Sequence, residues 1–245
     1  MGDGIKPTIY SHFTLGDMSA YYMLEEERQV ELLLVPVQKE KELNEKFDAL
    51  FDSKRLHGDS LIQVKLLNDM YPGAYGPGTS MRNSETIDMC RFEKQIHKTE
   101  GAKEVIETYL EDGRGHNFIH TLTWTKGEYA LGSTTTIINN ADTPTTLELL
   151  TSFSLGLISP FEEADASECL KLHRIRSKWS QEGRLVTESA EDLQLEPSWA
   201  YWQVNSTRYG QIGSMPVKGY FPFGAVEDTK AGVVWAAQLA IECSW

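Results

Sequence analysis

The sequence predicts an all-β protein in which antiparallel sheets pack face to face. Most of its 245 residues fall into short segments that alternate polar and apolar side chains or are rich in β-branched and aromatic residues. Gly, Asn, Asp or Pro bounds these segments, which is typical of half-buried antiparallel strands joined by turns. Only one stretch shows helical spacing of its apolar residues, so the layers must be sheets rather than helices.

A first series of strands occupies the beginning of the chain and is interrupted by the one predicted helix. The strands are expected at Tyr10–Leu15, Ala20–Glu25, Val30–Val37 and Leu61–Leu66. The helix is predicted for Glu40–Ser53, where apolar residues recur at spacings of three and four. These residues are Leu43, Phe47, Leu50 and Phe51.

A second series of strands follows, and turn signals such as Glu111-Asp112-Gly113 imply consecutive hairpins. In one of these strands, Leu170, Leu172, Ile175 and Trp179 are the expected inward positions. The strands are expected at Thr86–Gln95, Ala102–Glu111, His116–Lys126, Glu128–Asn139, Thr145–Leu155, Glu168–Trp179, Gly183–Ser189, Gly219–Ala225 and Gly232–Ile241.

Composition and charge limit the binding partners and the cellular compartment that can be expected for this chain. The formal net charge is −13, and the basic residues are scattered among acids, which argues against nucleic acid and anionic membranes as partners. Cys90, Cys169 and Cys243 lack any ligand spacing and are expected to be buried free thiols of a reducing compartment. With no secretory leader pattern and no long apolar run, a cytoplasmic location is expected.

Titratable residues do not assemble a self-sufficient catalytic or metal site in the sequence. Neighbouring acids at Glu162-Glu163, Glu191-Asp192 and Glu227-Asp228 point to opposite faces of an extended strand, so they are interpreted as turn charges. His116 and His120 share one face of a strand, but no acidic third ligand can be placed beside them. We therefore predict no catalytic residue, no metal and no cofactor.

Two segments carry candidate contacts to a ligand. Gly73–Gly78 lacks the Lys-Ser/Thr ending of a phosphate loop and is interpreted as a rigid loop that displays Thr79–Asn83, including Thr79 and Arg82. An alternative for Arg82 is an ion pair with Glu85 or Asp88. Aromatic residues after Pro197 could stack on sugar rings or cover a core edge; they are Trp199, Tyr201 and Trp202.

Longer motifs resemble a known family. The stretch from Arg208 to Trp235, RYGQIGSMPVKGYFPFGAVEDTKAGVVW, resembles the end of the N-terminal domain of glycoside hydrolase family 36, the α-galactosidases. TSMRNS at Thr79–Ser84, LELLTSFSL at Leu147–Leu155 and LHRIRSKWSQEGRL at Leu172–Leu185 are similar to the same family in the same order. The resemblance thins before Asp59, so the Glu40–Ser53 helix is expected to be a local elaboration.

The resemblance implies a β-supersandwich of two large antiparallel sheets, like that of galactose mutarotase, over residues 1–245 as a single domain. In the family a (β/α)₈ barrel follows and carries both catalytic aspartates, so no residue of this chain inherits a catalytic role. The abrupt end at Cys243-Ser244-Trp245 suggests truncation before that barrel. The implied partners are the barrel of the same parent chain, a second copy in an oligomer, and carbohydrate at a rim formed by Arg82, Thr79, Trp199 and Trp202.

Three functions are therefore compared. The first is a non-catalytic scaffold domain of an α-galactosidase-like enzyme, inactive on its own. The second is a free-standing carbohydrate-binding module. The third is a mutarotase-like sandwich enzyme, which requires a His and a Glu on a concave sheet face, and the sequence offers no visible pairing of these two residues.

Overall fold

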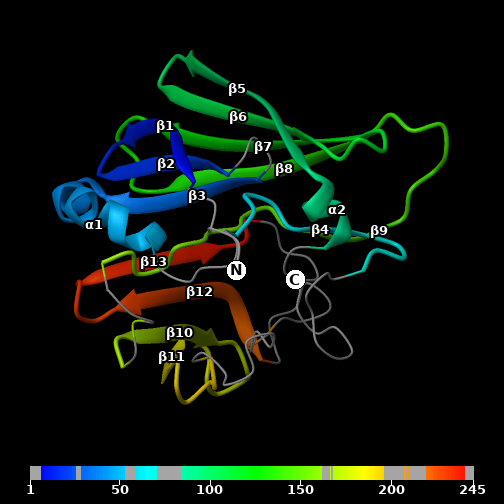
Figure 1. The fold of residues 1–245 in the computed structure, drawn as a ribbon. Coiled ribbons are helices and arrows are strands. Elements are labelled where there is room, and N and C mark those ends of the chain that lie inside the picture. Colours follow the sequence, from blue (N-terminus) through cyan, green and yellow to red (C-terminus); the bar gives the residue numbers. More distant parts are fainter. Residues whose placement is uncertain are drawn as a thin grey trace. The chain divides into compact units, whose positions relative to one another are not determined.

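The structure is a computed structural model that describes residues 7–25, 29–52, 59–70, 84–161, 166, 168–195, 207, 209 and 219–240. Strands account for most of these residues and every strand pairing is antiparallel, which confirms the all-β prediction (Figure 1). The elements are β1 (Thr8–Leu15), β2 (Met18–Glu25), β3 (Gln29–Pro36), the 3₁₀ turn η1 (Val37–Lys39), α1 (Glu40–Asp52), β4 (Val64–Leu66), α2 (Glu85–Met89), β5 (Arg91–Glu100), β6 (Lys103–Glu111), β7 (His116–Thr125), β8 (Leu131–Asn139), β9 (Leu147–Leu150), β10 (Leu170–Arg176), β11 (Arg184–Ser189), β12 (Tyr220–Asp228) and β13 (Val233–Gln238).

The described residues divide into two compact units. The first contains β1 to β9 with both α-helices, and the second begins at Ile158 and contains β10 to β13. The single domain predicted for residues 1–245 stays a prediction.

The first unit contains a sheet of order β1-β2-β3, a sheet of order β5-β6-β7-β8 and the short pair β4-β9. Neighbours in each of the two larger sheets are also neighbours in sequence, as the turn signals predicted. The β1–β2 turn requires a glycine for two reasons. Gly16 has a φ of 69°, and a Cβ at this position would lie 3.1 Å from the Trp124 ring.

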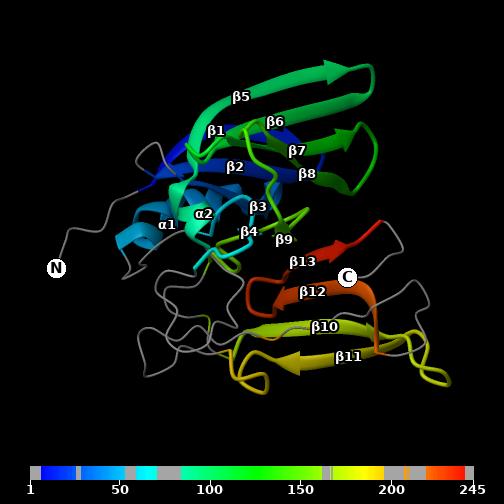
Figure 2. The ribbon, with the colours of Figure 1, turned by 90° about the vertical axis from the view of Figure 1, so that its right-hand side faces the viewer.

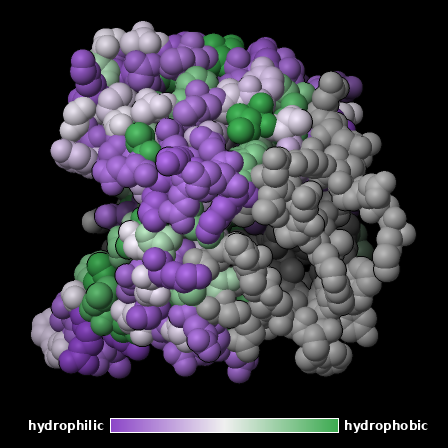
Figure 3. Space-filling view, turned by 60° about the vertical axis from the view of Figure 1, so that its left-hand side comes forward, coloured by the Kyte–Doolittle hydropathy of each residue, from purple (hydrophilic) through white to green (hydrophobic). Residues whose placement is uncertain are grey.

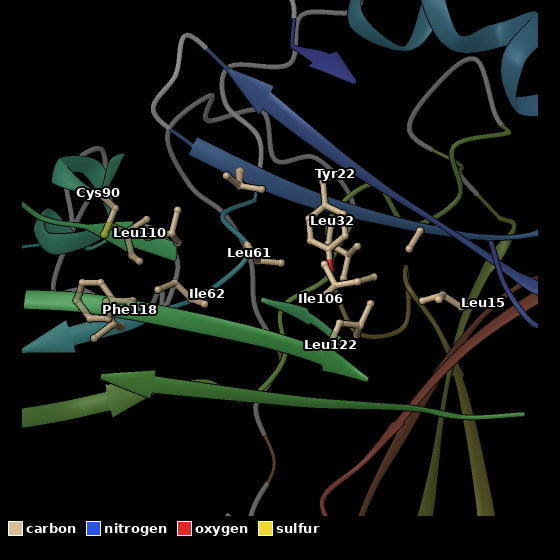
Figure 4. Close-up of a cluster of buried hydrophobic side chains, with 14 of the residues drawn as sticks. Leu15, Tyr22, Leu32, Leu61, Ile62, Cys90, Ile106, Leu110, Phe118 and Leu122 are labelled. Atoms are coloured by element: carbon tan, nitrogen blue, oxygen red, sulfur yellow. The ribbon is translucent and has the colours of Figure 1, made fainter. Parts of the chain in front are cut away.

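An apolar core joins the two larger sheets of the first unit (Figure 4). Alternate residues of β6 and β7 face this core, since Ile106 and Leu110 are paired with Leu122 and Phe118 across the two strands. On the opposing sheet, Tyr22 and Leu32 contribute from β2 and β3 (Figure 4). Burying each large apolar side chain stabilises the fold by about 1.5–3 kcal/mol before entropy is counted.

Helix α1 lies against the sheet β1-β2-β3 (Figure 2). Its first residue, Glu40, contacts His12 of β1 at 3.1 Å and accepts a hydrogen bond from the Ser19 hydroxyl of β2. Leu43, one turn later, is fully buried. The helix predicted for Glu40–Ser53 is thus confirmed to within one residue.

The strand predicted for Thr86–Gln95 is wrong in its first part. Residues Glu85–Met89 form helix α2, and β5 begins only at Arg91. Ser84 caps the helix by accepting a hydrogen bond from the Ile87 N–H at 3.3 Å, and Glu85 places negative charge in the first turn. The β-branched Thr86 and Ile87 suggested a strand, but the cap and the burial of both residues favour the helix.

The second unit contains one four-stranded sheet of order β11-β10-β12-β13. The inward position predicted at Trp179 is wrong, because this residue follows the end of β10 and its exposed fraction is 79%. Arg174 is buried on β10 instead, with an exposed fraction of 7%. It lies on the same face as Leu170 and Leu172, as the two-residue repeat of a strand requires.

The surface agrees with the acidic composition. On the face shown in Figure 3, hydrophilic residues cover much of the described surface, and hydrophobic residues gather mainly at its lower left. Among the helices of the described chain, none combines the length and apolar character needed to cross a membrane.

Candidate functional site

The four predicted contact residues, Thr79, Arg82, Trp199 and Trp202, all lie outside the described residues. The whole stretch 71–83 lies outside the described residues, and the described residues on its two sides, Met70 and Glu85 among them, lie next to each other in the first unit. The Glu85 N–H donates to the Met70 carbonyl at 2.7 Å, and the Met70 N–H donates to the Glu85 carboxylate at 3.4 Å. The flanks of the predicted rim loop are therefore joined by two hydrogen bonds.

A buried polar cluster, here called the Asp112 network, contacts the residues on both sides of the stretch 71–83. Asp112 forms its centre, with an exposed fraction of 1%. Its carboxylate accepts hydrogen bonds from the backbone N–H of Arg114 at 2.8 Å and of His116 at 3.1 Å, and it contacts His116 Nδ1 at 2.7 Å. The network consists of Asp69, Thr86, Asp112, Arg114, His116 and Thr145.

Two opposing effects set the ionisation of Asp112. Burial raises the pKa of its carboxyl group, whereas hydrogen bonds from the His116 side chain and from the N–H groups of Arg114 and His116 lower it. The hydrogen bonds dominate, so the pKa of Asp112 lies below its ordinary value. Asp112 is consequently a carboxylate that holds the turn between β6 and β7.

Arg114 connects this turn to both flanks of the predicted rim loop. Its Nε donates to Asp112 at 3.2 Å, and its guanidinium lies 3.5 Å from Asp69 and donates to the Thr86 hydroxyl. Thr86 in turn donates to the Asp69 carboxylate at 2.5 Å. One arginine thus orients residues that precede and follow the Thr79–Asn83 segment.

His116 extends the network to a third segment of the chain. Nδ1 of His116 faces the Asp112 carboxylate and Nε2 lies 2.8 Å from the Thr145 hydroxyl, so in the neutral imidazole with its proton on Nδ1 the Thr145 hydroxyl donates to Nε2. Acid, imidazole and hydroxyl are connected in the order that activates nucleophiles in hydrolases. Cys90, which is also buried nearby, is a neutral thiol, since burial raises its pKa to about 12.

His120 and the acid pairs that were considered in the sequence do not form one site with His116. His120 is buried apart from the network and contacts Ser133 through Nε2 at 2.9 Å. Among the described residues, no cluster of three or more His, Cys, Asp or Glu is arranged to hold a metal ion. Glu191 accepts from the Glu168 N–H at 2.7 Å, which makes it a turn charge, and Glu162-Glu163 lies outside the described residues.

Glu227 and Asp228 diverge in the second unit, as expected for neighbours on a strand. Asp228 is fully buried and accepts from the N–H groups of Lys230 at 2.9 Å and Ala231 at 2.8 Å, which closes the β12–β13 turn. Glu227 contacts Nε2 of His173 at 3.0 Å, while Nδ1 of His173 lies 2.9 Å from the Thr187 hydroxyl. The structure therefore contains a His–Glu pair that sequence reasoning missed, because the two residues are 54 positions apart.

Arg174 was also missed, although the alternation of β10 points to it. Its guanidinium carbon lies 4.5 Å from the ring centre of Tyr220 and 5.1 Å from that of Tyr209, and it forms an ion pair with Glu188. Tyr209 donates its hydroxyl to the Phe223 carbonyl at 3.1 Å, and burial raises the pKa of this phenol. The Arg174 Nε finds no hydrogen-bond partner among the described residues.

Known proteins match this chain in their fold but not in sequence searches. A scan with models of protein families finds no match. A search of curated protein sequences finds no significant relative. Solved structures do match: α-galactosidase AgaA of glycoside hydrolase family 36 from Geobacillus stearothermophilus has a TM-score of 0.52 over 88% of this chain at 12% sequence identity. The fold is one found in GH36 α-galactosidases.

A second GH36 enzyme of the same organism, AgaB, matches over 90% of this chain with a TM-score of 0.50 and 13% identity. The resemblance noted in the sequence is thus confirmed at the level of the fold. The chain spans only 31% of the length of AgaA and 32% of that of AgaB. This GH36-like fold therefore corresponds to about one third of each enzyme.

Proposed function

We propose that this chain is a non-catalytic domain of an α-galactosidase-like glycoside hydrolase and that it supports a (β/α)₈ catalytic barrel of the same parent chain. The observation that carries the proposal is the coverage: nearly the whole chain matches two α-galactosidases that are about three times as long. The remaining two thirds of such an enzyme has room for the barrel and for the catalytic carboxylates.

The proposal also gives this domain a role at the active-site rim, beside the Asp112 network. In the proposal, the Thr79–Asn83 segment reaches the mouth of the barrel and Arg82 donates hydrogen bonds to sugar hydroxyls. Asp69, Thr86 and Arg114 support this role because they hold together the two sides of residues 71–83, the stretch that contains this segment. A loop with fixed ends loses less conformational entropy when its tip meets a ligand.

Hydrolysis of an aryl α-galactoside by this chain tests the non-catalytic assignment. We expect no release of the phenol above the uncatalysed rate. Appreciable turnover that disappears in the Asp112→Asn variant would overturn the proposal and would assign the Asp112, His116 and Thr145 series a catalytic role.

In an enzyme that joins this chain to its barrel, Arg82→Ala should raise KM more than it lowers kcat, because a rim contact binds substrate and transition state alike.

Calorimetry with galactose and with raffinose separates the scaffold from a free-standing carbohydrate-binding module. A scaffold domain is expected to give no heat of binding at millimolar sugar. Saturable binding that is lost in Trp199→Ala or Trp202→Ala would instead support the binding module.

A mutarotase-like activity is a second candidate, favoured by the pairing of His173 with Glu227 on neighbouring strands. Such an enzyme interconverts sugar anomers by general acid and base steps. Polarimetry of freshly dissolved α-galactose measures this directly. Faster mutarotation with the wild type than with His173→Gln would favour this function, whereas equal rates would exclude it.

A further inference from the structure

The outer edge of strand β13 differs from the other sheet edges of the described chain. β13 is the last strand of the sheet β11-β10-β12-β13, and its sequence VVWAAQ contains no charge and no proline. Val234, Ala236 and Gln238 are all exposed, Val234 to 57%. An uncharged, exposed edge strand is a surface to which another strand can add.

The hydrogen bonds of β13 identify the groups that the edge presents. Leu239 donates its N–H to the Pro222 carbonyl at 3.0 Å, which makes this pair a hydrogen-bonded one. Because such pairs alternate along an antiparallel ladder, the odd-numbered residues of β13 bond to β12. The N–H and C=O groups of Val234, Ala236 and Gln238 therefore point away from β12.

Other outer strands carry features that discourage pairing. β5 has the sequence RFEKQIHKTE, with charges along most of its length, and β11 carries Arg184 and Glu188. β8 is uncharged, but its Ser133 hydroxyl donates to the Ser152 carbonyl at 2.6 Å, so a following segment lies beside it. β1 also lacks Lys, Arg, Asp, Glu and Pro, but its Ser11 hydroxyl donates to Gln95 of β5 at 2.6 Å and its Tyr10 ring lies 4.7 Å from the ring of Phe92, so side chains of β5 cover it. Among the described strands, β13 is an uncharged edge strand that pairs with one neighbour only, β12.

We propose that β13 pairs antiparallel with β13 of a second copy of this chain, so that two four-stranded sheets join into one of eight strands. The outward groups fit this symmetric arrangement, with Ala236 of both copies on the twofold axis and Val234 opposite Gln238. In the same register Trp235 faces Ala237 and Val233 faces Leu239. Every cross-strand pair is thus uncharged, and the small Ala236 allows close approach on the axis.

Charge favours a second copy over an acidic or a basic partner. The chain carries a net charge of −13, yet the stretch from Val233 to Leu239 contributes none of it. A basic partner would have no acidic residue to pair with on the β13 edge. A second copy would bring its own β13 edge, which is equally uncharged. The association is expected to be weak, with a dissociation constant of roughly 10–500 µM, since one strand pair must offset the cost of immobilising two molecules.

Sedimentation velocity over a concentration series tests the proposal. We expect the weight-average mass to rise toward that of a dimer, more strongly at high salt, which screens the repulsion between two acidic copies. Ala236→Lys places two like charges on the axis and should weaken the dimer by about fivefold or more. Thr136→Lys, at an exposed position of β8, another uncharged outer strand, is the matched control and should leave the dissociation constant unchanged.

Hydrogen exchange adds a residue-specific measurement. The amides of Val234, Ala236 and Gln238 should exchange more slowly at high protein concentration, while that of Ala237, which bonds to β12, should not change. A constant monomer mass up to about 1 mM, or a dimer that Ala236→Lys leaves intact, would overturn the proposal. Neither result bears on the proposed function, whose tests measure hydrolysis and sugar binding.

Discussion

The four-stranded sheets of the two units have the same size and the same antiparallel pairing, but different side chains stabilise them. The sheet β5-β6-β7-β8 places apolar residues such as Ile106 and Phe118 against the sheet β1-β2-β3. The sheet β11-β10-β12-β13 buries the charged Arg174 against the rings of Tyr209 and Tyr220. Each methylene group that is buried in an apolar core contributes favourably to the free energy of folding. A buried arginine loses the favourable free energy of its hydration, and its partners restore only part of that loss.

Two side chains that are buried to a similar extent can therefore stabilise their sheets to different extents. Glu188 and the two rings compensate the Arg174 guanidinium, yet its Nε has no partner among the described residues. We expect substitutions in the first sheet to have large effects and those at Arg174 to have small ones. Three measurements test this contrast.

The largest effect is expected for Ile106→Ala in the first unit. Ile106 is fully buried in the core, so its truncation leaves a cavity and should lower the free energy of unfolding by about 3–4 kcal/mol. Chemical denaturation measures the loss, and hydrogen exchange of the β6 and β7 amides assigns it to the first unit. Ile138→Ala on β8, where the exposed fraction is 40%, is the control and should cost less than about 1 kcal/mol. Equal costs at the two sites would contradict the apolar core as the main source of stability.

A pH-dependent effect of intermediate size is expected from His120 in the same sheet. Burial lowers the pKa of His120 from its ordinary 6.5 to about 4. The unfolded chain therefore binds a proton as the pH falls below about 6.5, while the folded chain resists protonation until about pH 4. The stability that His120 contributes is complete above pH 6.5 and is lost between these values, by about 3 kcal/mol in total.

Denaturation at a series of pH values tests this dependence, with His120→Gln as the matched variant. Gln keeps hydrogen-bonding groups for Ser133 but cannot ionise. Its free energy of unfolding should fall less steeply than that of the wild type from pH 6.5 to 4. Parallel curves for the two proteins would show that His120 is accessible to protons in the folded state.

The smallest effect is expected for Arg174→Met in the second unit. Methionine keeps much of the volume packed against the two rings and removes the buried charge, so the free energy of unfolding should change by no more than about 1 kcal/mol in either direction. Glu188→Ala should cost more, about 1–2 kcal/mol, because it leaves Arg174 buried without its carboxylate. A larger loss for Arg174→Met than for Glu188→Ala would mean that the guanidinium itself stabilises the sheet.

Strands and the long helix were predictable because their signals are local. The alternation in β6 and β7 and the helical spacing from Leu43 to Phe51 each fit one element without reference to others. Helix α2 was missed because Thr86 and Ile87 are good strand formers, although the Ser84 cap and the acids after it gave a local signal. β4 and β9 are shorter than predicted, since only part of each segment has a strand partner.

The candidate site was less predictable because its residues are brought together only by the fold. Asp112 was interpreted as part of a turn, and nothing in its neighbourhood indicates that Asp69, Thr86 and Thr145 converge on the same cluster. The His173–Glu227 pair depends on β10 and β12 lying side by side. Arg174 is the exception, since its position two residues from Leu172 already predicts the buried face.

The connectivity of the two sheets also has a consequence for the order in which they form during synthesis. The strands β5 to β8 pair only with their sequence neighbours, so each can join as soon as it leaves the ribosome. In the second sheet β10 must wait for β12, and the buried Asp228 receives the hydroxyl of Ser159, 69 residues earlier. The β10–β11 hairpin must therefore persist without its neighbour until β12 has emerged, and during that time the unpaired edge of β10 is exposed to aggregation.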